Sequence, residues 1–449
     1  MTVRKDFGWG RVARLGLVQA ALGAIVVLAT STLNRVMVVE LALPALLPGV
    51  LVAVHYLVQL ARPRMGHGSD LGGRRTPWII GGMGVLACGS ITSALATVWM
   101  GSRPVAGTAL ALLGFVLIGL GVSASGTSLL VLLSKRVAPE RRAGAATLVW
   151  LMMICGFAVT AGVAGKLLEP YSPVRLVAVV GAVSVFAFVL TLLALYKLEG
   201  AVTIDRAVEP APQRTQAVDF RAALREVWAD AKARRFAIFV FMSMLAYSAQ
   251  DLILEPFAGM VMGYTPGQST SLSGVQHGGV LAGMLLASLA GRRWRGRSFG
   301  SLRAWMIGGC VASAMAMAGL FASGLVGPAW PFPQTVFVLG VANGSFTIAA
   351  IGSMMQLASE GGGGREGVRM GLWGAAQAIA FGFGGLLGTG ASDLARLLFV
   401  APGPAYGSVF ALEAVMFLIA AHIAAGRLAP TARAAPAPVG LLQGNSGGG

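Results

Sequence analysis

The sequence predicts an all-α membrane protein of twelve transmembrane helices, arranged as two pseudo-symmetric halves of six helices each. Three observations carry this prediction: 56% of the 449 residues are hydrophobic and only 11% are charged, the apolar residues form twelve long runs, and one long polar segment divides the runs six and six. A soluble protein has about a quarter charged residues, whereas an apolar run of about 20 residues crosses a bilayer as a helix. Internal duplication of this kind is common in polytopic membrane proteins.

The apolar runs define four segments of the chain. The N-terminal half, 1–196, has its runs near 15–33, 43–61, 78–98, 105–133, 144–165 and 174–196. A polar linker, 197–234, carries a predicted amphipathic helix from Val218 to Ala233. The C-terminal half, 235–426, has its runs near 235–257, 268–290, 303–324, 334–356, 369–391 and 406–426. The tail, 427–449, is rich in Ala, Pro and Gly and has little apolar surface to bury, so we expect it to be disordered.

The basic residues lie on alternate turns between the runs. Of the 34 Lys and Arg residues, 29 fall in the head, the even-numbered turns and the tail. Because cytoplasmic loops of membrane proteins are enriched in Lys and Arg, this bias supports twelve spans with both termini in the cytoplasm. The net charge of +17 does not indicate nucleic-acid binding, since no basic helix is interleaved with aromatic residues. The lipid bilayer is the predicted partner of the apolar surface.

The motifs of enzymes and ATP-driven proteins are absent from the sequence. There is no P-loop, so ATP is not an expected energy source, and His-Glu-x-x-His and Gly-x-Ser-x-Gly do not occur. The three cysteines have no CxxC spacing and predict neither a metal site nor a disulfide framework. We therefore expect a protein without a catalytic site, a bound metal or a covalent cofactor.

A basic, glycine-rich turn joins the second and third runs. It contains Gly66-x-x-x-Asp70-x-x-Gly73-Arg74-Arg75, and glycine permits the sharp reversal between two antiparallel helices. On its own this is a positively charged cytoplasmic turn. Its spacing also resembles the loop between the second and third helices of major facilitator transporters, although Leu71 stands where that family usually has a basic residue. The resemblance implies a cytoplasmic gate formed by these glycines, Asp70 and the two arginines.

Polar residues lie at or near membrane depth in the first and seventh runs. They are Asn34, Arg35, Glu40, Gln250, Asp251 and Glu255. A charge inside the bilayer costs about 2.5–3.5 kcal/mol, so each such residue is expected to have a partner or a function. Aligning the two halves places Arg35 against Asp251, which predicts an ion pair that closes the periplasmic side. The alternative is that Arg35 and Glu40 reach out to the membrane surface.

Two histidines, His55 and His277, lie in the middle of predicted spans. A neutral imidazole is a common metal ligand and can bind the magnesium of a chlorin from a helix face. A single histidine in a membrane helix more often forms a hydrogen bond within the bundle. Both interpretations stay open for these two residues.

Several stretches are similar to one branch of the major facilitator superfamily. They are Thr32-Leu-Asn-Arg-Val-Met-Val-Val-Glu-Leu41, Leu43-Pro-Ala-Leu-Leu-Pro48, 68–80 and Gln250-Asp-Leu-Ile-Leu-Glu-Pro-Phe257. This is the bacteriochlorophyll-delivery group, the PucC and LhaA light-harvesting assembly proteins. The resemblance implies a protein of the photosynthetic (intracytoplasmic) membrane that binds or delivers bacteriochlorophyll, or chaperones light-harvesting antenna polypeptides. It also implies antenna polypeptides and pigment-synthesis enzymes as partners.

Two other functions remain open at this stage. One is a proton-coupled secondary transporter of a small solute, with Asp251 or Glu255 as its proton site. The other is a scaffold without a small ligand, which would hold partner helices through glycine-rich faces such as Phe381-Gly-Phe-Gly-Gly-Leu-Leu-Gly-Thr-Gly390.

Overall fold

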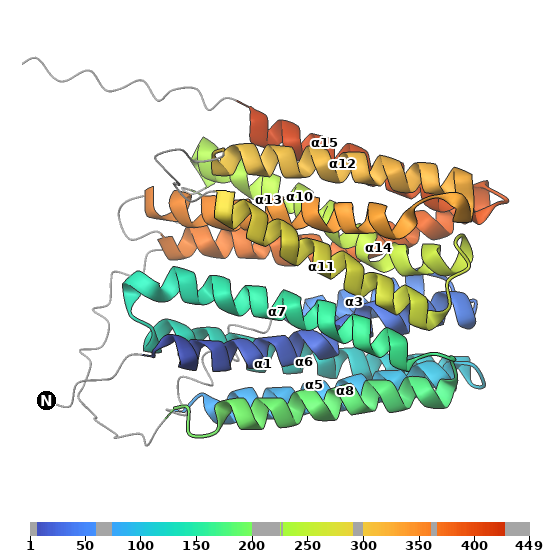
Figure 1. Cartoon of the computed structure of the whole chain (residues 1–449), viewed down its shortest axis with the longest axis horizontal. Helices are drawn as coiled ribbons and strands as arrows, with labels where there is room; N and C mark the ends of the chain where they lie inside the picture. Colours follow the sequence, from blue (N-terminus) through green and yellow to red (C-terminus); the bar gives the residue numbers. More distant parts are fainter. Residues whose placement is uncertain are drawn as a thin grey trace, which may run out of the picture.

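The computed structural model of the chain is a bundle of long, roughly parallel and antiparallel helices (Figure 1). It describes residues 7–59, 74–199, 225, 228–290, 300–360 and 366–426. The predicted gate residues Gly66, Asp70 and Gly73 lie outside the described residues, as do the tail and most of the linker. Most of the amphipathic helix predicted from Val218 to Ala233 falls outside them as well.

The N-terminal half begins with one nearly continuous helical rod. This rod consists of α1 (Trp9–Val27), the π-helical segment η1 (Leu28–Thr32), α2 (Leu33–Arg35) and the π-helical segment η2 (Val36–Glu40). The other helices of this half are α3 (Leu46–Val58), α5 (Thr76–Met100), α6 (Pro104–Arg136), α7 (Pro139–Leu167) and α8 (Pro173–Leu195). Several of these helices start at proline, which has no amide hydrogen to lose and whose φ angle is already helical. The Ser172 hydroxyl also caps α8 by accepting a hydrogen bond from the Arg175 amide at 3.1 Å.

The C-terminal half repeats this layout. Its elements are α10 (Ala231–Met260), α11 (Pro266–Ala290), α12 (Leu302–Val326), the short 3₁₀ turn η4 (Gly327–Ala329), α13 (Phe332–Glu360), α14 (Glu366–Leu398) and α15 (Pro402–Ala425). The Asp230 carboxylate caps α10, accepting from the Lys232 amide at 2.9 Å. The helix therefore starts at Ala231, inside the range predicted for the amphipathic linker helix.

The helices match the predicted membrane spans. Among the described residues, 11 helices are long and apolar enough to cross a membrane, and Leu46–Val58 is a shorter apolar helix. The apolar run of that shorter helix continues to residue 61 in the sequence, beyond the last described residue before the gap. The predicted arrangement of twelve apolar helices is confirmed.

The two halves lie against each other along two helix pairs. Within the N-terminal half α5 packs on α6 and α1 on α7 and α8; within the C-terminal half α11 packs on α13, α12 on α15 and α10 on α14. Between the halves the main contacts are α7 with α11 and α3 with α14. Figure 1 shows α7 and α11 side by side at the boundary of the two groups.

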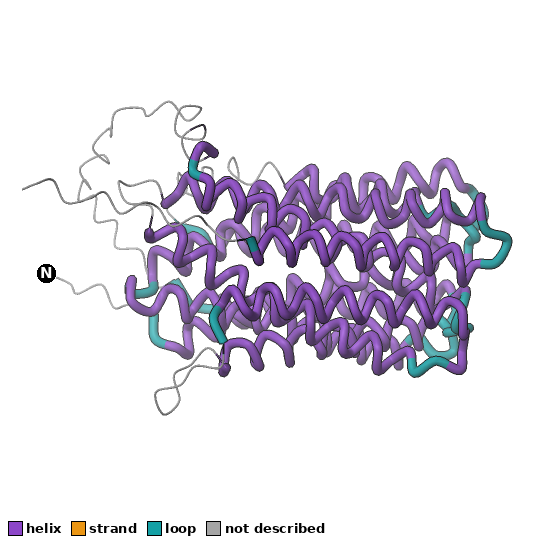
Figure 2. Tube along the Cα trace, turned by 90° about the horizontal axis from the view of Figure 1, so that it is seen from above, coloured by secondary structure: helices purple, strands orange, loops and turns teal. Residues whose placement is uncertain are grey.

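Both ends of the bundle can be defined by their residues. We call the end near Trp9, where α1 starts, the terminal end, and the end near Glu40 the distal end. The turns after Glu40, Leu167, Met260 and Leu398 belong to the distal end. Figure 2 shows the helices running the whole length between these ends, with described loops at both.

Apolar packing is concentrated inside each half. Phe257 of α10 lies at the centre of an aromatic cluster in the C-terminal half, with ring centroids 5.4 Å from Phe332, 5.1 Å from Phe410 and 5.8 Å from Tyr406. These edge-to-face contacts add about 0.5–1.5 kcal/mol each beyond burial. The C-terminal half therefore has an aromatic core of its own, and a smaller apolar cluster of Ile154, Val280 and Met284 joins α7 to α11 across the two halves.

Candidate functional site

The first membrane helix carries the most polar buried segment of the N-terminal half. The predicted span ended near residue 33, whereas the helical rod continues through Glu40. Ser31, Thr32, Asn34 and Arg35 are all buried there. The π-helical segments η1 and η2 flank the three residues of α2, and π-helical turns inside longer helices are frequent at functional sites. The rod continues because the C-terminal half supplies partners for these side chains.

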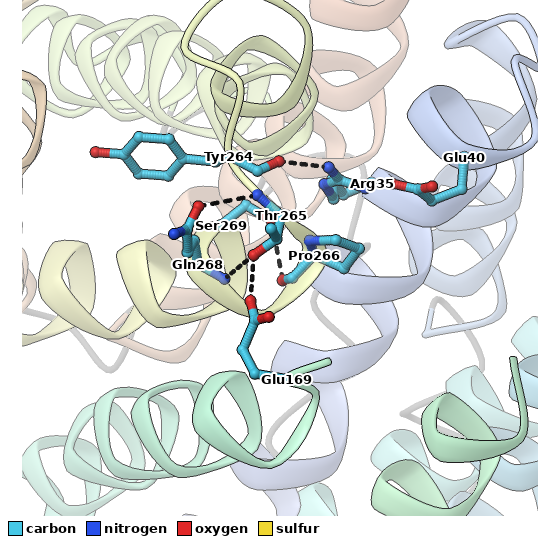
Figure 3. Close-up of polar contacts among 8 residues, drawn as sticks. All are labelled: Arg35, Glu40, Glu169, Tyr264, Thr265, Pro266, Gln268 and Ser269. Atoms are coloured by element: carbon cyan, nitrogen blue, oxygen red, sulfur yellow. Dashed lines mark hydrogen bonds and ion pairs between the residues drawn. The ribbon is translucent and has the colours of Figure 1, made fainter. Parts of the chain in front are cut away.

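Arg35 is 2% exposed and binds two partners (Figure 3). Its Nη1 atom forms an ion pair with Glu40, and its Nη2 atom donates a hydrogen bond to the carbonyl oxygen of Tyr264 at 2.7 Å. The predicted ion pair between Arg35 and Asp251 is therefore wrong for this structure. The sequence alignment of the halves placed Arg35 opposite Asp251, but Glu40 lies on the same rod and follows Arg35 closely enough to reach its guanidinium.

Two neighbouring residues of the same rod also bind the C-terminal half. The Asn34 amide donates to the carbonyl oxygen of Leu252 at 2.7 Å, and the hydroxyls of Thr32 and Thr270 lie 3.0 Å apart. Asn34 thus meets α10 one residue after Asp251. The structure brings together the polar segments of the first and seventh spans, as the alignment of the halves predicted, but with different atom pairs.

Glu255 is buried beside this contact. Its side chain is 2% exposed, and neither carboxyl oxygen has a hydrogen-bond partner within 3.5 Å among the described residues. The closest polar surroundings are the hydroxyls of Ser31, Ser269 and Ser273 and the positive charge of Arg35. Glu255 is therefore a buried carboxyl group at membrane depth whose oxygens can accept a hydrogen bond from a ligand.

Asp251 lies on the same helix, closer to the terminal end. It is partly exposed, and its carboxylate accepts a hydrogen bond from the Gln276 amide of α11 at 3.3 Å. Its neighbour Gln250 is fully buried, and both atoms of its amide lack a partner within the described ranges. A third carboxyl group, Glu413 of α15, is 1% exposed and interacts electrostatically with Asp251.

Glu413 was not among the predicted site residues. The signal was present, because an acidic residue in the middle of an apolar run is expensive and therefore informative. Asp251, Glu255 and Glu413 give the C-terminal half three carboxyl groups at membrane depth, and Arg35 is the nearby cation. We find no group of three or more metal-binding side chains in the part of the chain that the structure describes.

The distal end holds two further contacts between the halves. Glu169, after α7, accepts a hydrogen bond from the Thr265 hydroxyl before α11, and the Thr265 amide donates to Gln268 at 3.0 Å (Figure 3). Asp393 of α14 accepts hydrogen bonds from the amides of Ala45 and Leu46, at 3.0 and 2.8 Å. A carboxylate at the start of α3 also interacts favourably with the helix dipole.

These hydrogen bonds between the two halves share one location, from Thr32 toward the distal end. They involve the side chains of Thr32, Asn34, Arg35, Asp393 and Thr265. The halves are thus fastened at the distal end.

Replacing Asp393 with alanine is expected to loosen that end. The variant removes both acceptors for the α3 amides, and a helix cap of this kind contributes about 0.5–2 kcal/mol. Spin labels at Val105, at the start of α6, and Val400, in the turn after α14, are highly exposed and lie on opposite halves. The distance between them should increase. Asp393→Asn keeps one acceptor oxygen and should give a smaller shift. Unchanged distances in both variants would contradict a fastening role.

At the terminal end, two of the predicted gate residues, Arg74 and Arg75, lie within the described residues. Arg75 is buried, Arg74 is exposed, and both precede α5. The Glu199 carboxylate, just after α8, accepts from the amides of Arg75 and Thr76 at 3.0 Å and from the Thr76 hydroxyl at 2.7 Å. The sequence placed Glu199 in the linker and gave no sign of this cap, because the contact joins segments far apart in the chain.

The cap sets the ionisation of Glu199. Partial burial raises the pKa of this carboxyl, but the hydrogen bonds from Arg75 and Thr76 and the charge of Arg136 outweigh burial and hold the pKa below its usual 4.5. A carboxylate with a lowered pKa stabilises the folded state above its unfolded pKa and loses that contribution as the pH falls through the folded pKa. The stabilisation is therefore complete at neutral pH and disappears only in acid.

Glu199→Gln is expected to lower the thermal midpoint in detergent at pH 7, by the equivalent of about 1 kcal/mol for one helix cap. The difference between the two proteins should start to shrink as the pH falls through the usual 4.5 and disappear below the lowered pKa of the folded carboxyl, where wild-type Glu199 is neutral as well. Thermal unfolding followed across this pH range measures the effect. A pH-independent difference would mean that the carboxylate charge is not what matters.

The two histidines are held differently. Nε2 of His55 lies 2.8 Å from the Gln59 amide, and the His55 ring meets Tyr56 edge-on at 4.9 Å. Nδ1 of His277 lies 2.8 Å from the carbonyl oxygen of Ser273, and its ring meets Phe157 of α7 at 5.0 Å. A hydrogen on Nδ1 of His277 leaves the lone pair on Nε2. This is the arrangement in which a backbone carbonyl orients a metal-binding imidazole.

Comparison with known proteins identifies the family. A family model described as PUCC protein matches residues 32–431. The chain belongs to the PUCC protein family. This PUCC-family chain is 52% identical over 422 residues to the "Bacteriochlorophyll synthase 44.5 kDa chain" of Rhodobacter capsulatus, a match that covers 94% of this chain and 96% of the relative. It is 31% identical over 425 residues to "Protein PucC" of Cereibacter sphaeroides, covering 90% and 89% of the two chains.

Solved structures place the PUCC-family chain in the major facilitator fold. A mutant of the nucleoside transporter NupG superposes with a TM-score of 0.64 at 16% identity, covering 92% of this chain and 98% of that one. A bacterial homologue of the human lysosomal transporter Spinster, in an inward-facing and unoccupied conformation, gives 0.63 at 15% identity, covering 93% and 97%. At these identities the likeness concerns the fold alone.

Proposed function

We propose that this protein is an assembly factor of the photosynthetic membrane that binds bacteriochlorophyll and delivers it to light-harvesting antenna polypeptides. The observation that carries the proposal is the 52% identity, over nearly the full length of both chains, to a relative whose name contains bacteriochlorophyll. The match extends through the helices that form the interface between the halves, so a shared ligand would be bound by shared helices.

His277 is the proposed magnesium ligand within that interface. It is buried on α11, which packs against α7 of the other half, and Ser273 orients its ring. His55 is the second proposed ligand, but its Nε2 atom is already beside Gln59. We expect His277→Ala to remove most of the bound pigment and His55→Ala to remove less.

The proposed role is not enzymatic, in contrast to the word synthase in the relative's name. The described polar groups of the interface bind one another or stand alone at membrane depth, and the motifs of hydrolases and nucleotide-driven enzymes are absent from the sequence. A carrier returns the pigment chemically unchanged. Mass spectrometry of pigment before and after incubation with the purified protein distinguishes a carrier from a synthase.

The decisive experiment is purification in a mild detergent from a host that makes bacteriochlorophyll. Wild-type protein is expected to carry chlorin absorbance and to co-purify with antenna polypeptides, whereas His277→Ala should lose absorbance and keep its thermal midpoint. Colourless wild-type protein without antenna polypeptides, isolated from pigmented cells, would refute the proposal. Membership of the PUCC protein family supports a bacterial inner, intracytoplasmic membrane location, and the charge distribution supports both termini in the cytoplasm.

A second function, proton-coupled transport of a small solute, is favoured by the buried carboxyl groups of the C-terminal half. Solved proteins of the same fold include proton dependent oligopeptide transporters, and Glu255 and Glu413 have no hydrogen-bond partner within 3.5 Å in the described part of the chain. Proteoliposomes containing a pH-sensitive dye test this function: a solute that drives proton movement in wild type and not in Glu255→Gln would support it over pigment delivery.

The third function, a scaffold that binds partner helices through the glycine-rich segment 381–390, receives less support. Gly384 and Gly388 of this segment face α10. A Cβ added to Gly384 would lie 2.7 Å from the Leu245 carbonyl oxygen, and a Cβ added to Gly388 would collide with the Ala249 carbonyl oxygen. These glycines are therefore used inside the bundle. Phe383 is 62% exposed and remains on the outer surface.

A further inference from the structure

A cavity of about 450 Å³ opens at the terminal end of the C-terminal half. It lies among the start of α10, the start of α12 and the ends of α13 and α15. Its floor is apolar and is formed mainly by Phe236, Phe239, Met306, Leu357 and Ile423. None of these helices belongs to the N-terminal half, so the cavity is distinct from the interface described above.

Three basic side chains line the mouth of the cavity, and no described acidic residue does. They are Lys232, Arg235 and Arg303. The Arg235 Nε donates to the carbonyl oxygen of Ile423 at 2.5 Å, and Arg303 donates to those of Ala424 and Gly426 at 3.1 and 3.0 Å. The two guanidinium groups are thus fixed in place by the end of α15, and no carboxylate among the described lining residues neutralises their positive charge.

Gly426 belongs to this arrangement. A Cβ at this position would collide with the guanidinium of Arg235, so glycine leaves the space that the Arg235 side chain occupies. Arg235 and Arg303 donate to carbonyl oxygens at the end of α15, so replacing either would also remove that contact. The side chain of Lys232, at the start of α10, has no such contact among the described residues. Its ammonium group is therefore the basic group of the mouth that is best suited for substitution.

The N-terminal half has the same framework but a filled centre. Arg14 of α1 donates to the carbonyl oxygens of Ala194 and Tyr196 at the end of α8, as Arg235 does at the end of α15. Phe7 precedes Arg14 by the same offset as Trp228 precedes Arg235. Phe7 is 1% exposed and packs with Leu195 and Leu198, whereas Trp228 is 46% exposed.

This difference between the halves shows that the cavity is not a requirement of the fold. In one half an aromatic side chain from the preceding segment closes the bundle, and in the other the corresponding space stays open with basic residues around it. An apolar floor under three cations is complementary to an amphiphile with an anionic head.

We propose that this cavity binds the headgroup of an anionic phospholipid. The phosphate would lie against Lys232 and the outer faces of Arg235 and Arg303, and the first carbons of an acyl chain would cover the apolar floor. The charge distribution of the sequence assigns this end to the cytoplasmic leaflet, where anionic lipids collect. Basic pockets between membrane helices on that side are typical sites for such headgroups.

The test is lipid-dependent thermal stabilisation of the full-length protein in detergent. Phosphatidylglycerol is expected to raise the thermal midpoint in a saturable way, and phosphatidylcholine is expected not to. Lys232→Gln should weaken the apparent affinity for phosphatidylglycerol about five-fold, because one basic side chain near a membrane surface contributes about 1 kcal/mol. Lys166→Gln, at the distal end, is the matched control and should behave as wild type.

Arg14→Gln separates lipid binding from helix capping. It removes the equivalent cap in the half without a cavity, so its basal midpoint should fall while its response to phosphatidylglycerol is kept. Equal stabilisation by phosphatidylcholine, equal stabilisation by inorganic phosphate alone, or an unchanged affinity in Lys232→Gln would each overturn the proposal. Inorganic phosphate acting alone would instead identify a site for a soluble anion. Because none of these readouts involves pigment, they succeed or fail independently of the proposed delivery function.

Discussion

Replacing Arg35 with glutamine is expected to destabilise the protein by about 3 kcal/mol and, under the proposed delivery function, to abolish antenna assembly. Removing one partner of a buried ion pair typically costs about 3–5 kcal/mol, and we take the lower end because Glu40 is 34% exposed. The variant also removes the hydrogen bond to the Tyr264 carbonyl and the positive charge near Glu255. The thermal midpoint in detergent and antenna absorbance in cells measure the two effects.

Charge reversal distinguishes the observed pair from the one that the sequence suggested. Arg35→Glu combined with Glu40→Arg re-forms an ion pair and should recover part of the midpoint lost in either single variant. Arg35→Asp combined with Asp251→Arg should recover nothing, because Asp251 contacts Gln276 and not Arg35. Recovery by the second combination alone would show that the functioning protein pairs these residues in another conformation.

Gly283→Val is expected to produce the second large effect, a loss of about 1–3 kcal/mol or failure to fold. A Cβ added to Gly283 of α11 would collide with the Val341 carbonyl oxygen of α13. In the opposite direction, a Cβ added to Gly344 of α13 would collide with the Val280 carbonyl oxygen of α11. Helices that approach this closely leave no room for a side chain, and forcing one into a packed interface separates the helices.

Gly278→Val is the matched control on the same helix. Its added Cβ would meet nothing within 4 Å, so its free energy of unfolding should change by less than about 0.5 kcal/mol. Both variants carry the same change in helix propensity, and the difference between them isolates the contact with α13. Equal midpoints for the two variants would contradict the close approach of α11 and α13.

The polar positions of the first and seventh spans were identifiable from the sequence because membrane depth makes each of them costly. Their pairing was not. Arg35 had two acidic residues within its expected reach, and only the geometry of η2 places Glu40 beside it. Glu413 illustrates the opposite case, since its cost was visible in the sequence but its proximity to Asp251 depends on the packing of α15 against α10.

The caps at the two ends of the bundle lay beyond prediction for a related reason. Asp393 and Glu199 bind amides of helices that start far away in the chain. A side chain at a span boundary looks the same in the sequence whether it binds water or a distant helix. The loop resemblance that predicted a gate at Gly66, Asp70 and Gly73 concerns residues outside the described ranges, so that gate remains a prediction.

The sequence by itself determined the twelve apolar helices and their grouping into two sets of six, because the length and apolarity of a span are set by the solvent that surrounds it. Tertiary structure alone decided which polar groups meet, which end of the bundle is fastened and where a cavity remains. Those outcomes depend on distances between helices, and residues such as Asn34 and Leu252, or Asp393 and Leu46, become neighbours only after the two halves have packed together.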